Sequence, residues 1–206
     1  MKELVVASKN LGKVGEIRAM VEPLGIQVSS LAELAPKLEI EEDGESFAEN
    51  AVKKAVLVSE ALERPALADD SGLEVDILAG QPGVRSARYG GEGLDDQERY
   101  QRLLTELFVV PPHRRIARFR CAMAYIEPEA DPVLFHGTLE GKIADRPAGT
   151  YGFGYDPIFI PEGYDKTLAE ITPDVKNRIS HRAKALQAFL RWLEVRTSIA
   201  PPPPAT

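Results

Sequence analysis

The sequence predicts an α/β fold built on a mixed β-sheet, and two observations carry this prediction. Near the amino terminus, an apolar run at residues 3–7 precedes a polar, glycine-containing loop and a helix, an order typical of α/β folds. Further along, residues 116–126 alternate between apolar and polar side chains, a turn follows at 127–132, and residues 133–143 return as the partner strand, which predicts a β-hairpin. A hairpin is antiparallel, so the sheet that contains it must be mixed.

Helix-start signals and apolar spacing place the other elements. Ser46–Glu49 and Asp95–Glu98 have the capping-box pattern that opens a helix. In chain order we expect strands at 3–7, 26–31, 65–68, 116–126, 133–143 and 158–160, and helices at 14–24, 47–62, 96–108, 172–175 and from 181 onward. The glycine-rich segment 73–93 should form a short helix and an irregular loop. We expect one domain over residues 1–198 and a frayed, proline-rich tail over residues 199–206.

Composition narrows the class of protein. The 206 residues include 25 Lys and Arg against 32 Asp and Glu, a net charge of −7, which argues against nucleic acid or an anionic membrane as a partner and favours a small molecule. Cys121 is the only cysteine, which excludes an intrachain disulfide and, with three histidines, argues against a His/Cys zinc site. No signal peptide and no apolar stretch of about 18 residues is found, so we expect a cytoplasmic protein with no membrane span.

Two adjacent carboxylates, Asp69 and Asp70, follow the short apolar strand at 65–68. Neighbouring side chains on an extended segment point to opposite faces, so we expect one carboxylate to be structural and the other to face a cleft. The alternative is a polar turn whose side chains bond local backbone. Four more carboxylates lie between Glu39 and Asp43, and they form either an exposed acidic loop or the source of a ligand that joins Asp70 around a hard cation.

Residues 8–13, Ser-Lys-Asn-Leu-Gly-Lys, join the first strand to the first helix. Such a loop presents backbone N–H groups and the positive end of a helix dipole to an anion, which makes it a candidate phosphate site. The spacing of a P-loop is absent, so an ordinary βα loop is the alternative. Glu49 and Lys53 lie one turn apart on the helix at 47–62 and form either a surface salt bridge or a flank of the cleft.

Two later segments favour a planar ligand. In residues 150–157, Phe153 offers a stacking face and Asp156 an acceptor for a base edge, unless the segment is only a bent loop that packs rings on the core. The pair His181–Arg182 follows Ser180 at a helix start and is suited to an anion or a base edge. A divalent cation between them would explain carboxylates beside phosphate-binding lysines, and oxygen-only ligands favour magnesium.

Six blocks of the sequence carry a resemblance to a known family: Ser8–Lys13, Glu49–Ala51 with Lys53, Ala68–Leu73, Ser86–Tyr89, Gly152–Pro157 and Ile179–Arg182. They resemble the signature blocks of the Ham1/RdgB family of inosine and xanthosine triphosphate pyrophosphatases. They occur in the family's order over residues 8–182. The departures are Ser8, where many members have threonine, and the proline tail beyond residue 199.

The resemblance implies an elongated sheet, two lobes around a cleft and a homodimer. It also implies that ITP, dITP, XTP and dXTP are hydrolysed to the monophosphate and pyrophosphate with Mg²⁺. By motif position, the catalytic group is Asp70, Asp69 and Lys53, with Asp70 as proton acceptor, and the magnesium ligands are Glu41 and Asp70. The implied substrate-binding residues are Ser8, Lys9, Asn10, Leu11, Gly12, Lys13, Ser71, Phe153, Gly154, Tyr155, Asp156, Lys176, His181 and Arg182.

Discrimination should rest on the six-position of the purine, where inosine and xanthosine carry an oxygen and adenine an amino group. Donors such as the Arg182 side chain or backbone N–H groups would then reject adenine. Three alternatives stand beside this reading: a Maf-type pyrophosphatase acting on modified pyrimidines, a catalytically silent nucleotide-binding regulator and a structural protein. The Ser180–Arg182 and Gly152–Pro157 blocks favour the purine enzyme over the Maf type.

Overall fold

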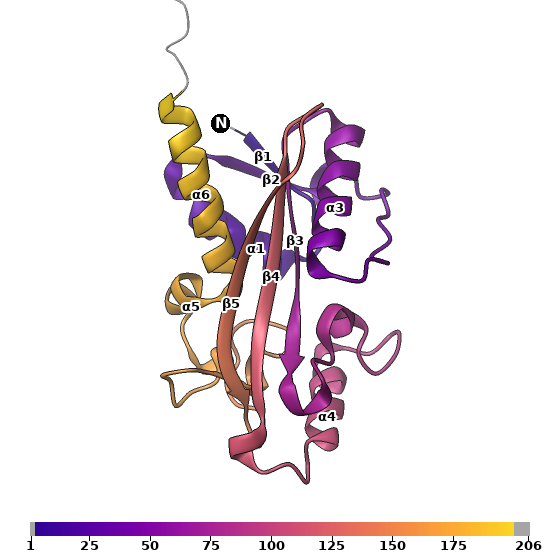
Figure 1. Ribbon diagram of the computed structural model, residues 1–206, viewed down its shortest axis with the longest axis vertical. Coiled ribbons are helices and arrows are strands. Elements are labelled where there is room, and N and C mark those ends of the chain that lie inside the picture. Colours follow the sequence, from indigo (N-terminus) through magenta and orange to yellow (C-terminus); the bar gives the residue numbers. More distant parts are fainter. Residues whose placement is uncertain (1–2, 200–206) are drawn as a thin grey trace, which may run out of the picture.

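The computed structural model describes residues 3–199, which fold around a six-stranded mixed sheet (Figure 1). Its strands are β1 (Glu3–Val6), β2 (Gln27–Ser30), β3 (Ala66–Val75), β4 (Ile116–Ile126), β5 (Val133–Ile143) and β6 (Phe159–Pro161). Their order across the sheet is β2-β1-β3-β4-β5-β6. β1 is parallel to β2 and β3, whereas all later pairs are antiparallel, which confirms the mixed sheet.

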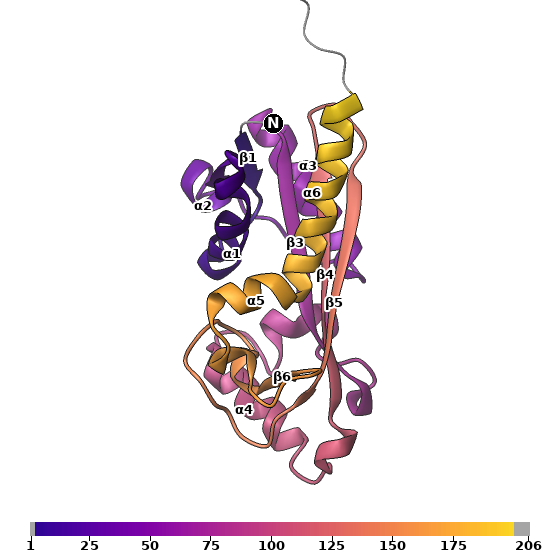
Figure 2. The ribbon, with the colours of Figure 1, turned by 90° about the vertical axis from the view of Figure 1, so that its left-hand side faces the viewer.

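Helices pack around both halves of the long sheet. The helices are α1 (Leu11–Val21), α2 (Leu31–Leu34), α3 (Phe47–Leu62), α4 (Asp96–Glu106), α5 (Pro173–Ile179) and α6 (His181–Ile199). Short 3₁₀ helices cover Glu22–Leu24, Asp76–Leu78, Gly83–Arg88, Pro112–Arg114, Asp156–Ile158 and Leu168–Glu170. α3 and α6 flank the upper half of the sheet, while α4 lies beside its lower half, where β6 pairs with β5 (Figures 1 and 2). None of the helices within residues 3–199 is long and apolar enough to cross a bilayer.

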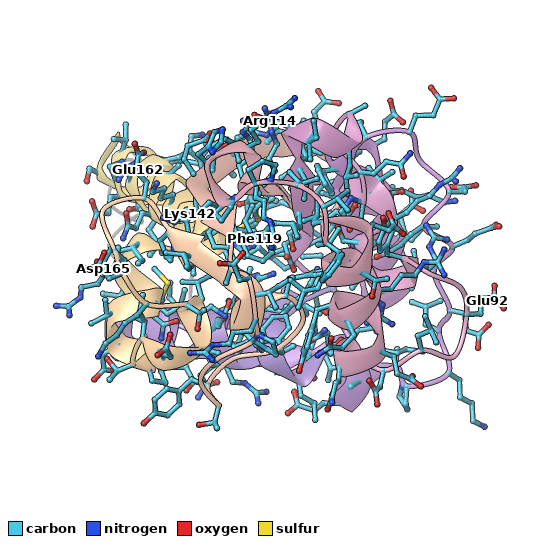
Figure 3. The ribbon with its side chains drawn as sticks, turned by 90° about the horizontal axis from the view of Figure 1, so that it is seen from below. Glu92, Arg114, Phe119, Lys142, Glu162 and Asp165 are labelled. Carbon is cyan, nitrogen blue, oxygen red and sulfur yellow. The ribbon has the colours of Figure 1, made fainter. Side chains whose placement is uncertain are left out.

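Three buried clusters hold this arrangement together. One lies between the sheet and the helices α1 and α6, and includes Ile17, Met123 and Phe189. The second lies under α3, and the third fills the lower half of the molecule. Seen from below, Phe119 lies in the interior of the lower half and Glu92 and Asp165 lie at its periphery (Figure 3). The helices thus divide the molecule into an upper and a lower part, and the long strands β3, β4 and β5 connect them.

The strand that carries Asp69 and Asp70 is longer than the sequence suggested. We expected a strand at 65–68 that ends at the carboxylates, but β3 continues to Val75 because β4 pairs with it along its whole length. The strand that ends beside the carboxylates is β1, which pairs with β3 only at Ala66 and Leu67. The two carboxylates therefore lie where one edge of β3 loses its neighbour, and this break in the sheet positions the site.

Other element bounds follow the sequence closely. The hairpin has the expected bounds, and α3 and α4 begin as expected after Ser46 and Asp95. α1 begins earlier than expected, at Leu11, because the side chain of Asn10 accepts a hydrogen bond from the Lys13 backbone N–H at 3.1 Å and caps the helix. The segment 73–93 contains the end of β3 and two 3₁₀ helices. Of the expected tail, residue 199 ends α6 and residues 200–206 lie outside the described range.

Candidate active site

A cleft opens beside β3 where β1 ends. It consists of two adjoining cavities of about 320 Å³ and about 440 Å³, which share Asn10, Lys13, Glu42 and Ala87. The first also has among its lining residues Asp70, Ser71, Phe153, Gly154, Tyr155, Asp156, Lys176, His181 and Arg182. The second also has Ser8, Lys9 and Lys54. Most of the residues expected from the sequence therefore meet in one place, although they come from α1, β3, α5, α6 and the loop before β6.

Asp69 is the structural member of the carboxylate pair. Its side chain is fully buried, and its Oδ2 accepts hydrogen bonds from the Arg182 guanidinium and the Ser71 hydroxyl, each at 3.1 Å. The Lys13 ammonium lies 3.1 Å from the same oxygen. Burial alone would raise the pKa of this carboxyl, but the charges of Lys13 and Arg182 outweigh burial and hold the pKa well below its usual range. Asp69 is thus a permanent anion that fixes two cations of the cleft.

Asp70 points to the opposite face of β3, toward α3. Its Oδ1 lies 3.1 Å from the Lys54 ammonium, and its Oδ2 accepts a hydrogen bond from the Asn50 amide at 3.1 Å. Burial raises the pKa of Asp70, and the nearby Glu42 carboxylate adds to this, so the lysines compensate only in part. The two neighbouring carboxyls therefore have opposite pKa shifts, because the strand's alternation gives them different surroundings.

Lys54 and Glu42, rather than Lys53 and Glu41, are the residues that the structure places beside Asp70. The Lys54 ammonium also lies 2.5 Å from Glu42 Oε1, and its pKa is raised because the two carboxylates outweigh the effect of burial. Lys53 instead pairs with Asp43 at 2.5 Å on the surface. Glu41 is exposed and lines neither cavity. The two residues that the family resemblance implied, Lys53 and Glu41, therefore lie apart from Asp70 in this structure.

Helical spacing could have distinguished the two lysines. Lys54 lies three residues after Ala51 and four before Val58, so it shares their buried face, whereas Lys53 does not. No comparable signal separates Glu42 from Glu41, because the acidic loop has no regular period. The backbone carbonyl of Glu42 also accepts a hydrogen bond from Arg88 at 2.8 Å, a contact between segments far apart in the sequence.

The glycine and aromatic loop before β6 forms one wall of the first cavity. The Phe153 ring packs against α1 at Gly12, where an added Cβ would lie 2.6 Å from the ring. The ammonium of Lys176 lies 4.8 Å and the guanidinium of Arg182 5.7 Å from the ring centroid. Gly152 has φ +76° and leaves room for the Asp156 carboxylate, which accepts a hydrogen bond from the Phe153 N–H at 2.9 Å.

Hydrogen bonds tie this loop to distant elements. The Gly154 N–H donates to Asp96 at the start of α4 at 2.7 Å, and the buried Tyr155 hydroxyl donates to the Ser86 carbonyl at 2.9 Å. Backbone N–H groups were among the donors expected for a base edge. Those of Phe153 and Gly154 are already bonded to side chains of the protein.

Glu16 on α1 belongs to the site and was not found from the sequence. Its carboxylate lies 2.7 Å from the Lys176 ammonium and also pairs with the Arg182 guanidinium. Burial would raise the pKa of Glu16, but these two cations outweigh it and lower the pKa. Lys176 pairs in addition with Asp156. Glu16 therefore holds together two cations that would otherwise repel each other, and only the tertiary fold brings the three residues together.

His181 completes the wall of the first cavity. Its ring stacks on Phe119 at a centroid distance of 4.7 Å with an angle of 9° between the planes. Burial and the neighbouring charge of Arg182 lower the pKa of His181 well below its usual value, so the imidazole is neutral. Its Nδ1 has no hydrogen-bond partner among the residues that the structure describes.

The second cavity lies at the amino end of α1. There the Ser8 hydroxyl accepts a hydrogen bond from the Asn10 N–H at 3.1 Å, and Lys9 is exposed. Leu11 and Gly12 of the expected 8–13 segment line neither cavity: Leu11 is 76% exposed, and Gly12 packs against the Phe153 ring. This end of the cleft combines a helix start with the ammonium groups of Lys9, Lys13 and Lys54, which suits a phosphate chain.

The fold and cleft define an α/β protein with a charged cavity at a break in a mixed sheet, suited to a phosphorylated ligand with a planar group. The sequence model of the Ham1 family matches residues 4–192, and the chain belongs to this family. A dITP/XTP pyrophosphatase of Bacillus subtilis is 50% identical over 194 residues, which cover 94% of this chain and 98% of that protein. One of Halalkalibacterium halodurans is 48% identical over 194 residues, covering 94% and 100%. The Ham1 protein of Staphylococcus aureus has a similar structure, with a TM-score of 0.83, 39% identity and coverage of 95% and 100%.

Proposed function

We propose that the protein hydrolyses the deaminated purine nucleotides ITP, dITP, XTP and dXTP to the monophosphate and pyrophosphate, and so keeps these bases out of DNA and RNA. The observation that carries the proposal is the single cleft with two different ends. One end has an aromatic ring and base-edge donors, and the other has a helix start with lysines. The close identity to dITP/XTP pyrophosphatases over nearly the whole chain supports it.

Asp70 is the proposed proton acceptor for the attacking water. It lies at the junction of the two ends, since it lines the first cavity and contacts Lys54, which lines the second. Without a bound metal ion, burial raises the pKa of Asp70, which favours its acceptance of a proton. Asp69, by contrast, is buried among cations that keep it ionised, so its role is to position Arg182, Lys13 and Ser71. Most of the rate enhancement would come from positioning and charge.

Glu42 and Asp70 are the residues that would hold Mg²⁺. Their carboxylates share one ammonium group, which places two oxygen donors near each other, and oxygen donors suit this hard cation. Glu41, the ligand implied by the resemblance, lies outside both cavities. When bound, the ion would neutralise negative charge on the departing pyrophosphate. Lys13 and Lys9 line the same end of the cleft and would bind the phosphate oxygens.

Selectivity for deaminated purines is assigned to the side chains of the first cavity. Hypoxanthine and xanthine present an oxygen at the six-position, and Lys176, Arg182 and neutral His181 can each donate a hydrogen bond. Adenine presents an amino group there and would leave these donors facing another donor, which costs far more than a missing contact.

We further propose, from the family resemblance, that the protein is a cytoplasmic homodimer. Light scattering of the purified protein would test the dimer.

The test is pyrophosphate release from ITP, dITP, XTP, GTP and ATP, each with Mg²⁺ and with the metal removed by chelation. We expect rapid release from ITP, dITP and XTP only, and none without the metal. Two neighbouring variants sharpen the assignment: Lys54→Met should reduce kcat/KM by about a hundredfold or more, and Lys53→Met far less. Equal turnover of ATP, or a larger loss for Lys53→Met, would contradict the proposal.

A further inference from the structure

Lys54 sits between the two carboxylates that would bind a cation. Its ammonium lies 2.5 Å from Glu42 Oε1 and 3.1 Å from Asp70 Oδ1, and its side chain is only 7% exposed. The backbone around Glu42 is held in place by α3 and Arg88: the Gly44 N–H donates to Asn50 at 2.8 Å, and Arg88 donates to the Glu42 carbonyl at 2.8 Å. The ammonium group therefore occupies a defined position between two oxygen donors.

The two carboxylates are too few to hold a divalent cation tightly. No group of three or more Asp, Glu, His or Cys side chains suited to a metal occurs within residues 3–199. Mg²⁺ sites of this kind use one or two carboxylates and complete the coordination with substrate phosphates and water. A cation that reached Glu42 and Asp70 would also have to displace the Lys54 ammonium from both, leaving a mostly buried positive charge beside a divalent ion.

The Lys54 ammonium can leave the two carboxylates only toward the second cavity. Lys54 lines this cavity together with Ser8, Lys9 and Lys13, at the end of the cleft suited to phosphate. A phosphate group in that cavity offers the ammonium a new anionic partner at the moment it leaves the carboxylates. Its flexible four-carbon stem allows such a change of partner without movement of α3.

We propose that Lys54 and the divalent cation compete for the carboxylates of Glu42 and Asp70, so that the cation binds weakly until a nucleotide phosphate takes up Lys54. This inference rests on the proposed magnesium site. It makes the binding of metal and of triphosphate cooperative, because each removes an obstacle to the other. The enzyme would then take up its metal together with the nucleotide.

The competition can be measured with Mn²⁺ as the probe, by electron paramagnetic resonance of the purified full chain without nucleotide. We expect Lys54→Gln to bind Mn²⁺ at least about tenfold more tightly than the unmodified protein, because the competing charge is gone. Lys53→Gln removes the same charge one residue away, from a surface pair, and should leave the affinity within about twofold. Lys54→Arg keeps the charge and should resemble the unmodified protein.

Inorganic pyrophosphate then tests the coupling. It should tighten Mn²⁺ binding by about tenfold or more in the unmodified protein and distinctly less in Lys54→Gln, in which no ammonium remains to be displaced. Equal Mn²⁺ affinity of Lys54→Gln and the unmodified protein, or an equal pyrophosphate effect in both, would overturn the proposal. Mn²⁺ binding is measured without turnover. A failure to hydrolyse ITP would therefore contradict the proposed function but would not affect this test of the competition.

Discussion

Replacing Asp69 by asparagine should destabilise the fold far more than the same change one residue along, at Asp70. Asp69 is fully buried and its Oδ2 lies 3.1 Å from both Lys13 and Arg182. Loss of its charge leaves Arg182 with Glu16 as its only carboxylate partner in the described chain, and Lys13 with none. Breaking a buried ion pair from one side costs about 3–5 kcal/mol. For a chain of this size, that lowers Tm by roughly 6–20 °C.

Asp70→Asn is the matched control. Burial raises the pKa of Asp70, so its charged form is disfavoured in the folded state, and an amide of the same shape can remain beside Asn50. The change also removes the buried partner of Lys54, but Lys54 keeps Glu42 at 2.5 Å. We therefore expect a smaller loss of unfolding free energy than in Asp69→Asn, about 1 kcal/mol, while pyrophosphate release is abolished. Urea unfolding at pH 7, followed by circular dichroism, gives both stabilities. Equal losses for the two variants, or a larger loss for Asp70→Asn, would refute the division of roles.

The pH dependence gives a second check on Asp69. Its pKa in the folded state lies below the unfolded value near 3.8, so its stabilising contribution is present above that pH and is lost as the pH falls. The difference in stability between the unmodified protein and Asp69→Asn should therefore shrink below about pH 4. A difference that stays constant down to pH 2 would mean that the carboxylate charge is not what stabilises the fold.

Two further predictions concern the walls of the first cavity. Gly12→Ala places a methyl group 2.6 Å from the Phe153 ring, so KM for ITP should rise by about tenfold. Gly15→Ala on the same helix meets nothing within 4 Å and should leave KM unchanged. An unchanged KM for Gly12→Ala would show that the position of the ring does not matter for substrate binding. The pKa of His181 is lowered by burial, so its neutral form is favoured and stability should fall by up to about 1.4 kcal/mol per pH unit below pH 6.5. Urea unfolding between pH 5 and 7 should show this slope in the unmodified protein and lose it in His181→Gln.

The strands and main helices could be predicted from the sequence because their signals are local. Apolar alternation and the turn after it gave the bounds of β4 and β5, and side chains with capping potential placed the starts of α3 and α4. The length of β3 could not be predicted, because it depends on pairing with β4 rather than on residues within the segment. A polar Asp-Asp-Ser-Gly stretch favours a turn on its own, and only its partner strand keeps it extended.

In the candidate site, too, residues with a local sequence signal could be predicted, and residues placed only by the tertiary fold could not. Motif positions identified Asp70, Lys13 and the residues around Phe153 because each block is contiguous in the sequence. Glu16 and Asp96 escaped detection because they act on other segments, Glu16 through Lys176 and Arg182, and Asp96 through the Gly154 N–H. Their roles exist only once the loops fold together.

The two ends of the cleft differ in how firmly their charges are held, and this difference assigns them different tasks. At the base end, the carboxylates of Asp69, Glu16 and Asp156 meet the cations Arg182 and Lys176 in a connected network, which Lys13 joins where the two cavities adjoin. All six side chains are less than a fifth exposed. Such a balanced network is costly to rearrange, so its donors stay fixed and can reject a wrong base edge. At the phosphate end, Lys9 is exposed, and the exchange of anions proposed for Lys54 would take place there. We therefore propose that selectivity belongs to the rigid end, and the charge exchange that accompanies catalysis to the adaptable one.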